Sequence, residues 1–402
     1  MYRGKQLGES WASLGAGTLK ENMQLTLMGS AEEITEEAAE KVVFEEDLNI
    51  LEKAGLLKAE HPPGLMNLGN TCYLNSALQL LGSIPELRTH AKKYAASTPL
   101  QDQPLVKQFG VLCSDFESNL PQLMPMLLWS ALKQSYPQFD QKTDEGHPMQ
   151  HDSEEALSSI LYSLDSKLPQ LELPADAPPG ALEAASFSGT SAIQQLLHGR
   201  FETHTTCLEK PEDVSDSEES FLKLKCHIDI KTNFLMDGIQ PTLTEQIEKY
   251  SPFLDRNALY QTTRTFSRLP KYLIVHFVRF LWRKGEGSKE GARAKILRPV
   301  DFPMELDLFP LCSKTLQQKL KYKRDILERH EQSKLGLASK SAAASSTSTA
   351  LDQPSSSVSS ILDPFENDSG MYELTGVVSH KGRTAYGGHY VAWIRDAKDP
   401  NL

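Results

Sequence analysis

The sequence predicts an α+β fold. Apolar residues repeat with the period of an α-helix in the first half of the chain, whereas the second half contains runs of β-branched and aromatic residues typical of strands. Helices first and strands later indicate an α+β architecture, and no internal repeat is visible. The 402 residues allow two or three domains, or one large domain with insertions.

Composition excludes several classes of protein. The 53 acidic and 42 basic residues give a net charge of −11, which argues against nonspecific nucleic-acid binding because that needs a basic surface. The five cysteines contain no C-x-x-C pair, so they form neither a disulfide framework nor a zinc ribbon and fit a reducing compartment. The sequence shows no signal peptide and no apolar run of about 18 residues. We therefore expect a cytoplasmic or nuclear protein.

The N-terminal part of the sequence divides into two segments before the folded core. Residues 1–30 contain one strand-like stretch, MQLTLMGS, with nothing before it that could complete a sheet. Residues 31–62 are acidic and helical in composition, and we interpret them as a linker. The folded core is predicted to begin near Pro63.

Two helices are predicted in the first half. After Cys72, apolar residues follow the i, i+3, i+4, i+7 pattern of a buried helix face, and either Asn70 or Thr71 can cap the start. A second helix follows Asp152 and Glu155, which have the spacing of a capping box. Its apolar stripe continues to residue 168, and the Pro/Ala-rich residues 169–190 are predicted to form a loop.

The second half is predicted to supply strands around one insertion. Residues 271–282, KYLIVHFVRFLW, are apolar on both faces and predict a buried strand, and 300–308 is a shorter strand candidate. Residues 335–370 are rich in Ser and Ala and predict a disordered insertion. Two further strands, 372–380 and 389–395, are joined by KGRTAYGG.

Cys72 lies where a nucleophilic thiol is favoured. If the preceding Asn is the cap, this cysteine is in the first turn of a helix, where unpaired N–H groups and the helix dipole stabilise a thiolate. Asn67 is five residues upstream, where its amide could reach a developing oxyanion. The alternative is a small buried hydrophobic residue beside an Asn that serves only the turn. Position alone leaves both interpretations open.

A nucleophile needs a base, and two histidines are candidates. His276 lies within the apolar strand 271–282, where a histidine is more often part of the core. His389 follows two glycines, which permit close approach, and opens the strand HYVAW. A histidine there can deprotonate a thiol and later protonate an amine leaving group. Its alternative is an exposed turn histidine.

Four stretches in this order resemble the sequence boxes of the ubiquitin-specific proteases, peptidase family C19. They are GLMNLGNTCYLN, SRLPKYLIVHFVRF, VDFPMELDL and GGHYVAW, and they extend from residue 64 to residue 395. GTLK, LTLMGSA, SIPELR, YPQFDQK and RNALY are similar to the proteasome-associated type of this family. The resemblance implies a papain-like fold, with a helical thumb, a palm and β-rich fingers, over residues 63–402.

The resemblance also implies an activity and its residues. It implies hydrolysis of the bond after the C-terminal glycine of ubiquitin, with ubiquitin, ubiquitinated proteins and the regulatory particle of the 26S proteasome as partners. It assigns Cys72 as nucleophile, His389 as general base and acid, and Asn67 as oxyanion donor. It assigns binding of the ubiquitin tail to five residues, Gln150, Asp152, Glu155, Gly388 and Tyr390. Capping of a helix is the alternative role for the two acids. KGRTAYGG is similar to a loop that covers the active site.

Three departures from the family pattern define further expectations. Only Cys207 and Cys226 fall in the fingers region, where many members have four zinc ligands, so we expect no metal and no cofactor. Residues 1–30 correspond to a remnant of a ubiquitin-like domain of about 75 residues, so proteasome docking is expected to be weak. The family places an Asp or Asn on a strand after the catalytic histidine, and the sequence stops at DAKDPNL. This leads us to expect an incomplete catalytic domain, and a catalytically impaired ubiquitin-binding module is the alternative function.

Overall fold

The computed structural model describes seven stretches of the chain, which are residues 63–99, 102–118, 120–173, 190–283, 292–334, 363–382 and 387–395. Side chains of 281–293 and 330–334 are not described. The predicted ubiquitin-like remnant, the acidic linker and most of the predicted Ser/Ala-rich insertion lie outside the described residues. Within the described ranges, no helix combines the length and the apolar character that a membrane span requires.

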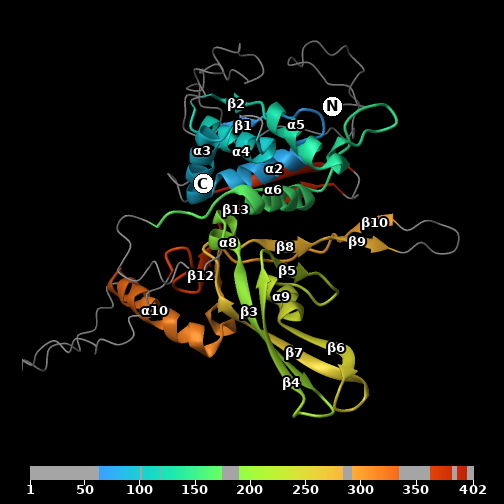
Figure 1. Cartoon of the computed structure of the whole chain (residues 1–402), viewed down its shortest axis with the longest axis vertical. Helices are drawn as coiled ribbons and strands as arrows, with labels where there is room; N and C mark the ends of the chain where they lie inside the picture. The colour runs from blue at the N-terminus through green and yellow to red at the C-terminus, as the bar shows by residue number, and fades with distance from the viewer. Residues whose placement is uncertain are drawn as a thin grey trace, which may run out of the picture. The chain divides into compact units, whose positions relative to one another are not determined.

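Helices from the first half of the chain pack around one core (Figure 1). Their bounds are α2 Cys72–Gly82, α3 Pro85–Ser97, α4 Pro104–Asp115, α5 Met126–Ser135 and α6 Ser153–Lys167, with a short 3-10 turn η3 at Pro137–Asp140. Two of these helices begin with proline, whose missing N–H costs nothing at that position. Two short strands, β1 Gly64–Leu65 and β2 Gln122–Leu123, pair in parallel beside them. This region corresponds to the thumb.

The predicted helices at Cys72 and Asp152 are confirmed, and the structure decides their caps. Thr71, not Asn70, is the N-cap residue of α2, and its side chain makes no capping hydrogen bond. Gly69 and Asn70 both have positive φ, 96° and 55°, so they form the tight turn that precedes the helix. Asp152 caps α6, because its carboxylate accepts a hydrogen bond of 3.0 Å from the Glu154 N–H.

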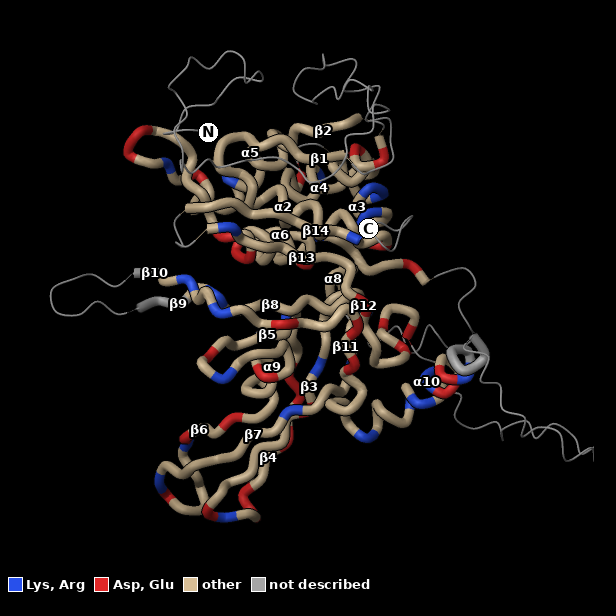
Figure 2. Tube along the Cα trace, turned by 180° about the vertical axis from the view of Figure 1, so that it is seen from behind, with Lys and Arg blue, Asp and Glu red and all other residues tan. Residues whose placement is uncertain are grey.

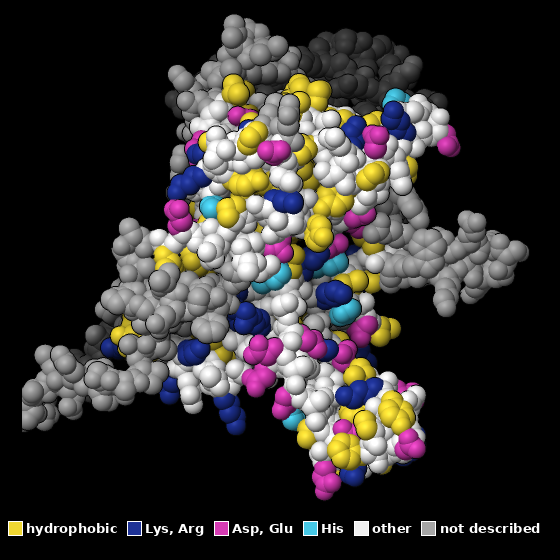
Figure 3. Space-filling view, viewed as in Figure 1, with side chains coloured by type: hydrophobic (Ala, Val, Ile, Leu, Met, Phe, Trp, Pro, Cys, Tyr) yellow, Lys and Arg dark blue, Asp and Glu magenta, His cyan; other side chains and the backbone are white. Residues whose placement is uncertain are grey.

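A four-stranded antiparallel sheet of order β4-β3-β7-β6 forms the fingers. Its strands are β3 Gly199–Cys207, β4 Val214–Phe221, β6 Thr244–Ser251 and β7 Arg256–Arg268, and the short helix α8 Ala192–Leu197 leads into β3. Buried and exposed residues alternate along β3, as expected for a strand with one covered face. Charges of both signs lie along these strands and along α10 (Figure 2). At the free end of the sheet several apolar side chains are exposed (Figure 3), including Leu208, Tyr250 and Phe253.

Short paired strands and two helices form the palm around a second core. The strands are β5 Leu224–His227, β8 Val275–Val278, β9 Phe280–Arg283, β10 Ala292–Lys295, β11 Glu305–Asp307 and β12 Met371–Glu373. The helices are α9 Leu235–Leu243 and α10 Lys314–Lys334, with the 3-10 turn η4 at Phe309–Leu311. The shorter predicted strand in 300–308 is confirmed as β11.

The prediction of one strand buried on both faces over residues 271–282 is wrong. The segment is divided into β8, which pairs with β5, and β9, which turns away to pair with β10. Residues 271–280 are all only half-buried. Alternate residues of the segment face different cores, Tyr272 and Ile274 the first and Leu273, Val275 and Phe277 the second, and each is covered only in part.

The end of the predicted disordered insertion is also corrected. Residues 363–370 are ordered, with the Phe365 ring buried in the first core and Asp363 almost inaccessible to solvent. Glu366 accepts a hydrogen bond of 2.8 Å from Arg268 Nε. An aromatic anchor and a buried ion pair hold this stretch, whereas the Ser/Ala composition of the preceding residues dominated the sequence-based prediction.

The last described element is an antiparallel hairpin of β13 Gly376–Lys381 and β14 His389–Ile394. Its register pairs Lys381 with His389 and His380 with Tyr390. The hairpin contacts helix α2, so that β14 runs beside the start of that helix (Figure 1). This packing brings the start of β14 to Cys72.

Candidate active site

Three segments of the chain meet at the Cys72 thiol. Cys72 is the first residue of α2 and is 5% exposed. The Gln150 side-chain amide donates to Sγ from 3.0 Å, and the backbone N–H of Tyr390 points to the same sulfur from 3.5 Å. The thiol therefore lies between the start of α2, the segment before α6 and the start of β14.

The starts of α2 and α6 are fastened together by buried contacts. The Ser153 hydroxyl donates to the Tyr73 carbonyl oxygen over 2.8 Å. The Tyr73 ring packs against Phe139 and edge-on against His151, with ring centroids 6.0 and 5.4 Å apart. Because Gln150 directly precedes His151, these contacts hold its amide against the thiol.

Asn67 is held through its amide oxygen, and no described residue hydrogen-bonds its amide nitrogen. Its Oδ1 accepts from the Thr71 N–H at 3.0 Å and from the Thr71 hydroxyl at 3.2 Å. With the oxygen used twice, Nδ2 is turned away from Thr71. The N–H groups of Leu74 and Asn75 both donate to the Thr71 carbonyl oxygen, so the orphan donors at this helix end are those of the first two residues, Cys72 and Tyr73. Asn67 is thus tied to the residue that precedes Cys72, and side-chain amides and helix-end N–H groups are the kinds of donor that stabilise the oxyanion of acyl transfer.

His389 is exposed. Of its two chain neighbours, Tyr390 contacts the Cys72 thiol and Gly388 contacts Gln150, the residue whose amide donates to that thiol. The Gly388 carbonyl oxygen accepts from Gln150 Nε2 at 2.9 Å, and the Tyr390 N–H points to Sγ. Across the described ranges, the His389 ring makes no hydrogen bond. The structure thus brings the His389 backbone to the Cys72 thiol without a bond between the two side chains. Asp396 and Asp399 lie outside the described residues.

The remaining predicted acids lie at the start of α6, where Ser153 is hydrogen-bonded to Tyr73 of α2. Asp152 caps α6, and the negative charge of Glu155 adds to the desolvation that raises the pKa of the Tyr73 phenol. The Asp152 and Glu155 side chains both make further interactions, so helix capping is not their only role. His276 lies on β8 opposite Lys225, and burial lowers its pKa so that the ring is neutral at pH 7.

Two residues that the sequence analysis did not select belong to the same neighbourhood. Lys295 Nζ lies 2.9 Å from His380 Nδ1 and donates to the carbonyl oxygens of His380 and Gly382, each over 2.8 Å. The sequence analysis treated His380 only as a strand residue. Its position two residues before a glycine-containing turn that leads to His389 was the one available signal.

The other thiols do not form a metal site with one another. Cys207 belongs to a small cluster at the end of the fingers, whereas Cys226 is in the palm core. Burial raises the pKa of Cys113 to about 12, of Cys226 to about 11 and of Cys312 to about 12. In the part of the chain that the structure describes, no three His, Cys, Asp or Glu side chains are grouped so that they could hold a metal ion.

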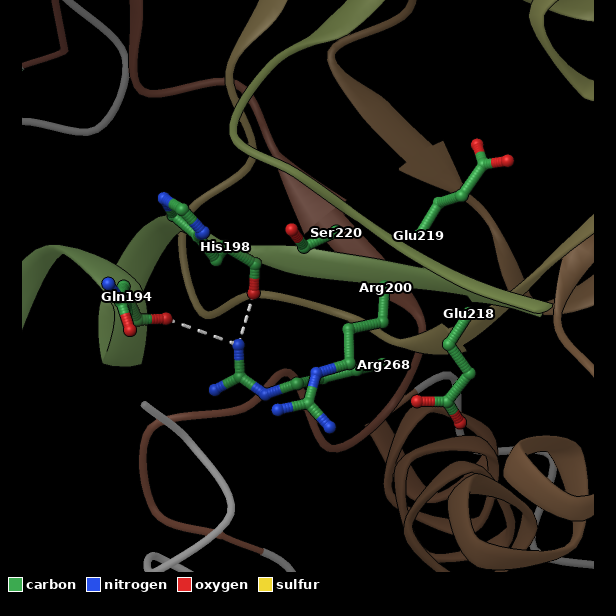
Figure 4. A pocket seen from close by; sticks show the side chains of 7 residues that line it. All are labelled: Gln194, His198, Arg200, Glu218, Glu219, Ser220 and Arg268. Atoms are coloured by element: carbon green, nitrogen blue, oxygen red, sulfur yellow. Dashed lines mark hydrogen bonds between the residues drawn. The ribbon is translucent and has the colours of Figure 1, made fainter. Parts of the chain in front are cut away.

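A polar cavity of about 380 Å³ lies elsewhere, at the junction of α8, β3, β4 and β7 (Figure 4). Its most buried lining group is Arg268, which donates to the carbonyl oxygens of Gln194, Gln195 and His198. This guanidinium is therefore committed to the fold. None of the lining residues contacts Cys72, so the thiol rather than this cavity marks the candidate active site.

A thiol at a helix start, with a histidine at the start of a neighbouring strand, defines a papain-like cysteine hydrolase. Residues 63–401 match the family described as "Ubiquitin carboxyl-terminal hydrolase". The chain belongs to this family, whose members are thiol-dependent ubiquitin hydrolases, and the resemblance noted in the sequence is confirmed.

Curated relatives agree over nearly the whole chain. Ubiquitin carboxyl-terminal hydrolase 6 of Arabidopsis thaliana is 36% identical over 404 residues, which cover 96% of this chain and 79% of the relative. Ubiquitin carboxyl-terminal hydrolase 6 of Schizosaccharomyces pombe is 35% identical over 421 residues, covering 99% and 81%. Ubiquitin carboxyl-terminal hydrolase 14 of Caenorhabditis elegans is 32% identical over 414 residues, covering 98% and 76%.

A solved structure is similar in fold. It is the SAGA Ubp8/Sgf11/Sus1/Sgf73 DUB module bound to ubiquitin aldehyde, with a TM-score of 0.54 and 16% identity. The match covers 83% of this chain and 62% of that one, which is less than two thirds of its length. The predicted fold class, an α+β papain-like protease of the ubiquitin-specific type, is confirmed.

Proposed function

We propose that this chain hydrolyses the bond after the C-terminal glycine of ubiquitin, with Cys72 as nucleophile, His389 as general base and acid, and Asn67 as oxyanion donor. One observation supports this assignment most directly. The Cys72 thiol is contacted by Gln150 and by the Tyr390 N–H, so His389 is held next to the residue that touches the sulfur.

The proposed reaction follows the chemistry of acyl transfer. His389 takes the thiol proton, and Cys72 Sγ attacks the glycine carbonyl carbon to form a tetrahedral intermediate. The negative charge on its oxygen is stabilised by Asn67 Nδ2 and the first N–H groups of α2. When the C–N bond breaks, the His389 proton passes to the lysine amine that leaves. Water, deprotonated by His389, then cleaves the thioester and releases ubiquitin and the free thiol.

Five residues are proposed to hold the ubiquitin tail, namely Gln150, Asp152, Glu155, Gly388 and Tyr390. Gln150 and Tyr390 contact the thiol and Gly388 binds Gln150, whereas Asp152 and Glu155 lie at the N-cap and in the first turn of α6, directly after this segment. The two carboxylates suit a tail that contains arginine, because carboxylates accept paired hydrogen bonds from guanidinium groups. In the free enzyme Gln150 Nε2 is engaged with Sγ and with the Gly388 carbonyl oxygen, so binding of the tail requires that this amide exchange partners.

The finer assignment is a role in trimming ubiquitin from substrates on the proteasome, in the cytoplasm and the nucleus. It is supported by the sequence stretches that resemble the proteasome-associated type and by the likeness to hydrolase 14 of Caenorhabditis elegans. This assignment predicts association with the regulatory particle. It is measured by co-purification of tagged chain with 26S proteasomes, and fluorescence imaging of the tagged chain in cells tests the location.

The experiment that tests the main proposal uses two ubiquitin derivatives. Ubiquitin with a C-terminal aminocoumarin measures turnover, and ubiquitin with a C-terminal electrophile measures covalent capture by the thiol. We expect turnover by the wild type and none by Cys72→Ala. Tight binding of ubiquitin without turnover or capture would instead support the alternative, a catalytically impaired ubiquitin-binding module.

A further inference from the structure

The Lys295 side chain joins strand β10 to the hairpin that carries His389. Its ammonium lies 2.9 Å from His380 Nδ1 and 2.8 Å from each of two carbonyl oxygens, those of His380 and Gly382. An ammonium has three protons, so these three acceptors satisfy it completely. Burial lowers the pKa of Lys295, and the nearby Arg279 charge adds to this effect.

The His380 ring supports both chain neighbours of His389. Its centroid is 4.5 Å from that of the Tyr390 ring, and Phe280 packs edge-on from the other strand pair with centroids 5.8 Å apart. Gly388 lies against the opposite edge of the ring, since a Cβ built on this glycine would be 2.6 Å from His380 Nε2. The ring therefore contacts the residue before His389 and the residue after it.

The bond to Lys295 sets the protonation of this ring. An ammonium can only donate, so His380 Nδ1 must be the acceptor and the neutral ring carries its proton on Nε2. A proton on Nδ1 removes the acceptor and places a second positive charge against Lys295. The geometry of the pair is therefore compatible only with the neutral ring.

We propose that Lys295 and His380 form a positioning pair for His389, which holds Gly388 and Tyr390 in place while His380 is neutral and releases them when His380 is protonated. The inference rests on the proposed role of His389. Neither residue touches the reacting atoms. They act through Gly388, whose carbonyl oxygen binds Gln150, and through Tyr390, whose N–H points to the Cys72 thiol.

Among the described residues, four charged or titratable groups face or influence the His380 ring. Lys295 faces it from β10, His389 and Tyr390 from β14, and Asp152 from the start of α6. Desolvation is the largest cause that lowers the pKa of His380, followed by the Lys295 charge, and His389 adds to it. Asp152 acts in the opposite direction.

The sign of the pH effect follows from these causes. The folded-state pKa of His380 is below its usual value near 6.5. The folded chain therefore binds fewer protons than the unfolded chain in this range, and the pair stabilises the hairpin at neutral pH. This stabilisation is lost as the pH falls from about 6.5 through the folded-state pKa of His380.

The test compares four variants with the wild type on ubiquitin aminocoumarin from about pH 7.5 to about pH 5.5. His380→Asn places an amide oxygen where Nδ1 accepts, but this acceptor cannot be protonated. Lys295→Met removes the donor, and Lys295→Arg offers a planar guanidinium that cannot serve three convergent acceptors equally well. Lys323→Met removes a half-exposed lysine of α10 that forms an ion pair with Asp368, and it is the matched control.

For kinetics, we expect Lys295→Met to lower kcat by roughly tenfold with little change in KM, because a displaced histidine impairs the chemical step more than binding. Lys295→Arg should recover part of this loss, and Lys323→Met should match the wild type. The ratio of the His380→Asn rate to the wild-type rate should rise at least about threefold as the pH falls, because only the wild type loses the bond to Lys295.

Thermal unfolding over the same pH range supplies a measurement that does not need turnover. As the pH falls, the midpoint temperature of unfolding should decrease more for the wild type than for His380→Asn. A rate ratio and a midpoint difference that are both constant with pH overturn the positioning pair. A wild type without turnover contradicts the proposed function of the chain, whereas the unfolding measurement still decides for or against the Lys295–His380 pair.

Discussion

Gly388→Ala is the single substitution that most directly tests whether the start of β14 positions His389. Gly388 has φ +140°, a conformation that residues with a Cβ rarely adopt. An added Cβ would lie 2.3 Å from the Lys381 carbonyl oxygen and 2.6 Å from His380 Nε2. Both neighbours belong to the opposite strand of the hairpin, and the first is a backbone atom that cannot rotate away. The alanine must therefore push the start of β14 from its position.

The size of the effect follows from these contacts. Carbon and oxygen atoms in van der Waals contact are about 3.5 Å apart, so relief of the clash requires a movement of about 1 Å. A displacement of this size in a reacting group can cost about 100-fold in rate. The unfavourable φ adds about 1–3 kcal/mol of backbone strain. We expect kcat/KM for ubiquitin aminocoumarin to fall by about 100-fold, together with a lower melting midpoint.

Gly146→Ala is the matched control. Gly146 also has positive φ, 82°, but a Cβ there would meet nothing within 4 Å. This variant has the backbone strain without the clash. Its melting midpoint should therefore be lower than that of the wild type, while it hydrolyses ubiquitin aminocoumarin at the wild-type rate. If Gly388→Ala stays within threefold of the wild-type kcat/KM, the Gly388 contacts do not position His389 and the reasoning is refuted.

Three further predictions address the nucleophile, the oxyanion donor and the fold. A ubiquitin electrophile should label Cys72 alone, because burial raises the pKa of Cys113, Cys226 and Cys312, and mass spectrometry that finds another labelled thiol contradicts this. Asn67→Ala should lower kcat by about 100- to 1,000-fold with little change in KM, as expected for one oxyanion donor. A rise in KM as large as the fall in kcat would contradict this role. Arg268→Met should destabilise the chain by about 3–5 kcal/mol in urea unfolding, because it leaves buried carbonyl oxygens and the Glu366 carboxylate without their donor. The exposed Arg256→Met should leave the unfolding midpoint close to that of the wild type, and a similar loss in both variants would show that burial does not decide the effect.

The sequence alone determined the local elements that carry the chemistry. The apolar spacing after Cys72 predicted α2, because a buried helix face repeats every three to four residues whatever it packs against. The Asp152 cap and the strand that begins at His389 were also visible, since capping and strand patterns are local. The predicted single strand 372–380 is wrong, because its first residues belong to β12, which pairs with β11, and only its later residues form β13 of the hairpin. The same local rules misjudged residues 271–282, because a run of apolar residues does not say how many strands will cover it.

Only the tertiary structure decided which distant groups meet. Gln150 lies 78 residues from Cys72, and Lys295 lies 85 residues from His380, yet each pair is in direct contact. The resemblance marked Gln150 as a residue that binds the ubiquitin tail, but no local pattern marks its contact with the thiol or the contact of Lys295 with His380, because the packing of α6 on α2 and of β10 beside β13 creates both. The residues proposed to carry out the reaction could be predicted from the sequence. The residues that hold them in position could not, because their contacts join segments that only the folded chain brings together.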